Sequence, residues 1–126
     1  MQENKNSRRA FLAGAGRLAG GGWLALNTPL LLAAGQAAAE QRAAGGAWIQ
    51  MTDQQARTCA AVVDQIIPPD DLPGAADAGV VHFIDQALGG FAADQVQLLY
   101  DGLADLDRRA GTAHAGSGGF AGLTFA

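Results

Sequence analysis

Residues 52–69 read TDQQARTCAAVVDQIIPP and contain the start, the body and the end of one helix. Thr52 and Gln55 have the spacing of a capping box, in which the side chain of each residue accepts a hydrogen bond from the backbone amide of the other. Pro68-Pro69 end the helix, because proline lacks an amide donor and disfavours helical geometry in the preceding residue. The apolar residues between these signals fall on one helical face, at Ala56, Cys59, Ala60, Val63 and Ile67.

Two more helices are predicted downstream. The first starts near Asp77 and ends at Gly89-Gly90, and the second runs from about Ala92 to Ala110. The apolar residues of the first are Val80, Val81, Phe83, Ile84, Ala87 and Leu88. The second has an apolar row of Val96, Leu99, Tyr100, Leu103 and Leu106, with Asp94, Asp101, Asp105 and Asp107 mostly on the opposite face. The sequence therefore predicts an all-α fold with a small three-helix domain behind an N-terminal segment.

Charge is distributed unevenly along the 126 residues. Residues 1–39 carry a net charge of +3 and residues 40–126 a net charge of −7. An acidic domain is repelled by phosphates, which argues against nucleic-acid binding. Cys59 is the one cysteine, so an intramolecular disulfide is impossible, and its place on the apolar face predicts a small core residue.

The N-terminus has the features of a twin-arginine export signal. The matching positions are Ser7, Arg8, Arg9, Phe11 and Leu12. A weakly apolar region follows to about Gly35, and Ala37-Ala38-Ala39 offers an A-x-A cleavage site. We therefore expect residues 1–39 to form a signal that is read by the Tat translocase. A retained membrane anchor stays open as an alternative, because residues 18–35 are uncharged, although glycines and Asn27-Thr28-Pro29 interrupt them.

Beyond the signal, we expect a linker at 40–51, a helical domain at 52–110 and a glycine-rich irregular tail at 111–126. Phe120, Leu123 and Phe125 have no predicted packing partner in that tail, which suggests a chain truncated at its C-terminus. Gly14, Gly16 and Ala19 match a G-x-G-x-x-A dinucleotide pattern, but it lies directly after two arginines without a βαβ context, and no acidic residue follows until Glu40. The sequence contains no Walker sequence and no motif for a covalent haem or an iron–sulfur cluster, so we expect no cofactor in this chain. Export in a folded state then suggests a cofactor-bearing partner that crosses the membrane with this chain.

A stretch that begins in the first helix and continues past it resembles the gluconate 2-dehydrogenase subunit 3 family. Its residues are Ile66, Ile67, Pro68, Asp70, Asp71, Pro73, Gly74 and Ala75, followed by Ala78, Gly79, Val80, Phe83, Ile84 and Asp85. The resemblance implies a non-catalytic small subunit of a periplasmic, membrane-associated dehydrogenase complex. FAD would be bound by a flavoprotein large subunit, and haem c by a cytochrome c subunit that this chain contacts indirectly. The small subunit would supply the export signal and stabilise the large subunit.

A free-standing periplasmic or membrane-tethered helical protein without an enzyme partner is the alternative function. Individual polar residues give no sign of a catalytic site. Asp70 and Asp71 are expected to form a turn rather than a calcium site, which needs six to eight oxygen ligands. His82 is expected on a helix surface, and His114 lies near Ser117 in the glycine-rich tail without the rigid frame that a nucleophile needs.

Overall fold

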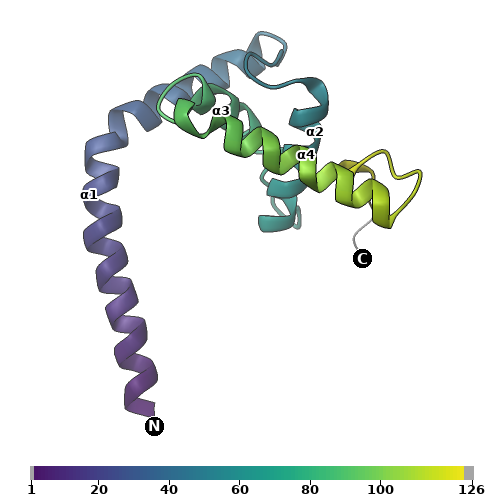
Figure 1. The fold of residues 1–126 in the computed structure, drawn as a ribbon. Helices are drawn as coiled ribbons and strands as arrows, with labels where there is room; N and C mark the ends of the chain where they lie inside the picture. Colours follow the sequence, from purple (N-terminus) through teal and green to yellow (C-terminus); the bar gives the residue numbers. More distant parts are fainter. Residues whose placement is uncertain (1, 124–126) are drawn as a thin grey trace. The chain divides into compact units, whose positions relative to one another are not determined.

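The computed structural model describes the backbone of residues 2–123, and the side chains of Ala10, Ala13 and residues 21–123. Its elements, in chain order, are α1 (Gln2–Ala43), α2 (Asp53–Ile66), α3 (Val80–Leu88), the 3₁₀ turn η1 (Ala93–Gln95), α4 (Val96–Ala113) and the 3₁₀ turn η2 (Phe120–Gly122) (Figure 1). No strand occurs among residues 2–123, which confirms the all-α prediction, and α2, α3 and α4 are the three expected helices.

The chain divides into two compact units, residues 1–33 and residues 34–126. Helix α1 supplies the whole described part of the first unit and the first ten residues of the second. Of the helices that the structure describes, none has both the length and the apolar character that a membrane crossing requires.

Helix α2 begins and ends as its sequence predicts. The Gln55 amide donates to the Thr52 hydroxyl over 3.1 Å, and the Thr52 amide donates to Gln55 Oε1 over 2.8 Å, so the capping box is complete. The helix stops at Ile66, just before the two prolines. Cys59 is 4% exposed on its inner face, which confirms the predicted core position.

The two later helices start further along the chain than predicted. Helix α3 begins at Val80 rather than near Asp77, because Gly79 has a positive φ of 90°, a conformation that interrupts a right-handed helix and that glycine adopts at little cost. The segment from Ala93 to Gln95 forms a 3₁₀ turn, so regular α4 starts at Val96 and continues to Ala113.

The core forms where α2 meets α3 and α4. Both α3 and α4 contribute residues from their predicted apolar rows. The buried cluster comprises Met51, Ala56, Cys59, Val63, Ala75, Val81, Leu88 and Leu103. Small side chains on α2 let the neighbouring helices approach closely, and Val96, Leu99 and Tyr100 of α4 pack at the margin of the cluster.

Residues 111–113 of the predicted irregular tail continue α4, and the segment around Phe120 packs against the helices, contrary to the expectation that it has no packing partner, whereas Phe125 lies outside the described residues. Turn η2 contacts both α2 and α4, and the Phe120 amide donates to Asp107 Oδ1 over 2.9 Å. The same carboxylate accepts from the buried Thr58 hydroxyl of α2 at 2.8 and 3.0 Å. The placement of Asp107 on the solvent face was therefore wrong: this carboxylate joins α2, α4 and η2.

Candidate functional site

The second unit has an apolar groove of about 650 Å³ between α3 and α4. One end of α2 reaches the groove through Val62, and the segment around η1 closes another side. The large apolar residues that line it include Phe83, Ile84, Phe91, Leu98, Leu99 and Leu106. Leu98 is 72% exposed, so part of the lining lies directly in water. An apolar surface of this kind is typical of a site that another molecule covers.

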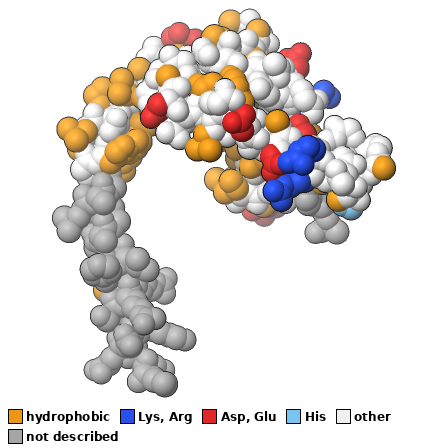
Figure 2. All heavy atoms as spheres, viewed as in Figure 1, with side chains coloured by type: hydrophobic (Ala, Val, Ile, Leu, Met, Phe, Trp, Pro, Cys, Tyr) orange, Lys and Arg blue, Asp and Glu red, His pale blue; other side chains and the backbone are white. Residues whose placement is uncertain are grey.

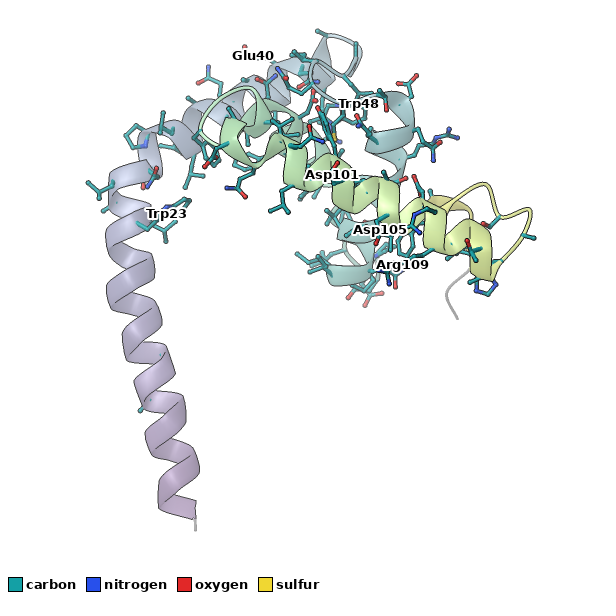
Figure 3. All side chains as sticks on the ribbon, viewed as in Figure 1. Trp23, Glu40, Trp48, Asp101, Asp105 and Arg109 are labelled. Atoms are coloured by element: carbon teal, nitrogen blue, oxygen red, sulfur yellow. The ribbon has the colours of Figure 1, made fainter. Side chains whose placement is uncertain are left out.

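A row of aspartates follows the groove, with Asp94 in η1 and Asp101 and Asp105 in α4. Asp94, Asp101 and Asp105 lie at i−4, i+3 and i+7 from Leu98, so they flank this leucine on the helix surface. Figure 2 shows acidic side chains beside apolar ones along α4, and Figure 3 labels Asp101 and Asp105 there. Asp105 forms ion pairs with Arg108 and Arg109, whereas no described lysine or arginine pairs with Asp94 or Asp101. The groove therefore has one edge with unneutralised negative charge.

Helix α3, which forms one wall of the groove, is anchored from behind by Asp85. This side chain is 0% exposed and belongs to the motif by which the sequence resembles a known family. Oδ2 accepts from the Ile49 amide and from Gln41 Nε2, both at 2.8 Å. Oδ1 accepts from the amides of Gln50 and Met51 at 2.9 and 3.0 Å. One carboxylate thus ties residues 41–51 to α3.

The protonation state of Asp85 follows from these contacts. Burial by itself would raise the pKa of this carboxyl group, because it disfavours the charged form. The hydrogen bonds from Ile49, Gln41, Gln50 and Met51 outweigh burial and hold the pKa below its ordinary value. Asp85 is therefore a charged acceptor at neutral pH, and its four hydrogen bonds fix the position of α3 relative to residues 41–51.

The loop between α2 and α3 is closely packed on its inner side and exposes apolar side chains on its outer side. The Leu72 amide donates to Asp70 Oδ1 over 2.8 Å, which confirms the predicted turn. A Cβ on Gly74 would lie 2.8 Å from Asp64 Oδ1 and from Pro69, so this position has no room for a side chain. On the outer side the exposed fractions of Ile66, Ile67 and Leu72 are 73%, 58% and 72%.

The predicted residues lie in different parts of the molecule. The side chains of Ser7, Arg8, Arg9, Phe11 and Leu12 lie outside the described residues. Of the motif residues, Ile66 ends α2 and the stretch from Ile67 to Ala75 forms the loop, while Phe83 and Ile84 line the groove. Ala78, Gly79 and Val80 lead into α3, and Asp85 is the buried anchor.

His82 is not the surface histidine that was expected. Its ring is half-buried and stacks on Trp48 with a centroid separation of 4.3 Å, and its Nε2 lies 3.2 Å from the Gly46 carbonyl oxygen. Figure 3 labels Trp48 in the segment between α1 and α2. The contacts of His82 hold the segment between α1 and α2, which Asp85 also anchors, so a packing role accounts for this histidine.

Two further observations concern chemistry at the site. Within the described part of the chain, no group of three or more histidine, cysteine or acidic residues is arranged to hold a metal ion. The groove lining contains one polar side chain, that of Gln95, so its surface suits apolar contact rather than acid–base chemistry.

Comparison with known protein families gives a match over most of the second unit. The family model described as gluconate 2-dehydrogenase subunit 3 matches residues 53–126, which include α2, α3, α4 and the groove. No curated protein and no solved structure matches the chain.

Proposed function

Because this chain belongs to the gluconate 2-dehydrogenase subunit 3 family, we propose that it is the non-catalytic small subunit of a membrane-associated flavin dehydrogenase complex. In that role it binds a flavoprotein large subunit, stabilises it and supplies the signal by which both are exported. FAD belongs to the large subunit, and haem c to a cytochrome c subunit that this chain meets only through the complex.

The observation that supports the proposal most directly is the groove between α3 and α4. Burying a leucine that starts largely exposed, as Leu98 is, contributes about 1.5–3 kcal/mol to association. Phe83 and Phe91 add aromatic surface, the kind that dominates the energetics of protein interfaces. We propose that an apolar helix or loop of the flavoprotein occupies this groove.

Charge specifies the partner further. Asp94 and Asp101 lack a cation among the described residues, and they lie beside the groove. A partner segment with lysine or arginine next to its apolar residues would satisfy both features, and its charge would also speed association. The proposed docking segment of the flavoprotein is therefore apolar with a basic flank.

The export role is supported by the sequence alone. Arg8 and Arg9 precede a weakly apolar region that runs to about Gly35 and carries no charge from residue 18 onward, a pattern typical of a twin-arginine signal, and the +3 charge of residues 1–39 contrasts with the acidic remainder. The proposed location is the periplasm, where the complex associates with the cytoplasmic membrane. The signal engages the Tat translocase before the complex crosses that membrane.

Docking is tested by co-expressing the chain with a candidate flavoprotein large subunit from the same genome and purifying through a tag on this chain. We expect the wild type to retain a yellow, FAD-containing partner. Leu98→Asp should weaken the complex by about 30-fold or more, because it removes about 2 kcal/mol of apolar burial and adds a like charge to the acidic row. Gln97→Asp is the matched control, since Gln97 is exposed and does not line the groove.

Equal affinity for the two variants would place the interface elsewhere, and a wild type that retains no flavoprotein would favour a free-standing helical protein. The export role is tested by Arg8→Lys with Arg9→Lys, which should leave both this chain and its partner in the cytoplasm. A flavoprotein that reaches the periplasm normally beside this variant would contradict that role.

A further inference from the structure

The expected signal cleavage site lies inside a helix that belongs to the folded domain. Ala37-Ala38-Ala39 is part of α1, which continues to Ala43, and the compact second unit begins at Ala34. Ala38 is 5% exposed, so its side chain is among the buried apolar residues of that unit. The peptide bond after Ala39 is therefore neither extended nor part of an exposed loop.

The residues just after this bond are held firmly. Gln41 Nε2 donates to Asp85 Oδ2 over 2.8 Å and to the Ala47 carbonyl over 2.6 Å. Gln86 Nε2 donates to Gln41 Oε1 over 2.9 Å. Arg42 Nη2 donates to the Asp77 carbonyl over 2.9 Å. Four hydrogen bonds thus join the last two turns of α1 to α3 and to the adjoining loops.

Proteolysis of a folded protein occurs where the backbone can open into an extended strand, which is why exposed loop tips are cut and packed helices are spared. Opening the helix around Ala39 would expose Ala38 and break the contacts of Gln41 and Arg42. When opening is followed by rapid reclosing, the cleavage rate falls with the population of the open form.

We propose that the bond after Ala39 stays uncut in the folded protein, so that residues from Ala34 onward remain part of the mature chain. The inference rests on the proposed export role, which is what brings the chain to a signal peptidase. It changes the predicted boundary: the folded domain needs α1 from Ala34, and removing residues 1–39 would cut into it. The N-terminal segment is then either retained whole or cut at or before Ala34.

The experiment is to recover the full chain, tagged at its C-terminus, from periplasmic and membrane fractions and to determine its N-terminus by intact mass and by sequencing. We expect a chain that starts at or before Ala34. A start at Glu40, or at any residue after Ala34, would overturn the inference.

A second variant carries a flexible eight-residue Gly-Ser insertion between Glu40 and Gln41. It keeps the A-x-A sequence and the residue after it, but it uncouples them from the residues that α3 holds. This variant should be cut after Ala39. If it stays intact, the fold is not what protects the site, and the inference fails.

Failure of export is distinguishable from failure of this inference. A chain found only in the cytoplasm would contradict the export role, and the cleavage question would then be answered in vitro. There, purified signal peptidase acts on the folded full chain and on the insertion variant, each in detergent. We expect at least a tenfold slower cut after Ala39 in the folded wild type, and equal rates would overturn the proposal.

Discussion

Replacing Asp85 by alanine should strongly destabilise the second unit. The carboxylate is fully buried and accepts four hydrogen bonds, three of them from consecutive backbone amides. Removing it leaves those donors without their acceptor. An orphaned buried donor costs about 1–3 kcal/mol, and hydrogen bonds to a charged group are worth about 1.5–3 kcal/mol each.

The four contributions do not simply add. Ile49 and Gln50 are exposed residues, so their amides can turn to water, whereas Met51 is 5% exposed and its amide cannot. We therefore expect a loss of about 3–5 kcal/mol in the free energy of unfolding, out of about 5–15 kcal/mol for a domain of this size. The melting temperature should fall by roughly 12–40 °C, at about 4–8 °C per kcal/mol.

The assay is urea unfolding followed by far-ultraviolet circular dichroism, with Asp101→Ala as the matched control. Asp101 is exposed and accepts from Gln97 of its own helix, so its loss should change stability by less than about 0.5 kcal/mol. If Asp85→Ala costs less than about 1 kcal/mol, the carboxylate does not hold residues 41–51 to α3, and the account of how the groove is positioned is wrong.

The same residue predicts a pH dependence. The pKa of Asp85 is lower in the folded chain than its ordinary value, so its contribution is complete above about pH 4 and is lost as the pH falls through the folded pKa. Asp85→Asn keeps the shape but removes this titration. The stability difference between the wild type and Asp85→Asn should therefore shrink as the pH falls below about 4, and a constant difference would contradict the assignment.

Two further predictions concern the backbone and the core. Gly79→Ala should cost about 1–2 kcal/mol of folding free energy because φ is 90° there. Gly111→Ala, in α4 with nothing within 4 Å of the added Cβ, should stabilise the chain by about 0.5–1 kcal/mol. Thermal unfolding compares the two variants, and equal effects would contradict the argument from backbone conformation. Burial raises the pKa of Cys59, so iodoacetamide should label this thiol only in the unfolded chain. The free energy of unfolding should also fall as the pH rises above about 9, and Cys59→Ala should abolish that fall. Fast labelling of the native chain would show that this thiol is not buried.

The helices could be predicted from the sequence because their signals are local. Thr52 and Gln55 cap α2 through contacts only three residues apart, and the two prolines end it wherever the rest of the chain lies. The apolar row of α4 likewise reports directly on its inward face, where Leu103 is 5% exposed. The later start of α3 depended on Gly79, whose positive φ the sequence permits but does not require.

The polar anchors could not be predicted in the same way, because their partners are distant in sequence. Asp85 accepts hydrogen bonds from residues 34–44 positions away, and Asp107 accepts from Thr58, which is 49 positions away. An aspartate within a helix is typical of a solvent-exposed position, so periodicity placed Asp107 on the outer face. Asp85 was singled out only by the family resemblance. The physical feature that would have identified it is the presence of a carboxylate on an apolar helix face, where it becomes buried.

During synthesis the amides of Ile49, Gln50 and Met51 lack their acceptor until Asp85 has been added, since 34–36 residues separate them from it. A bacterial ribosome adds about 5–20 residues each second, so this interval is about 2–7 s. During it the nascent segment before α2 has no buried acceptor for those amides and cannot adopt its final conformation. The surface that α3 helps to form therefore appears only after α3 has been synthesised, which delays any assembly with a second polypeptide through this surface until that point.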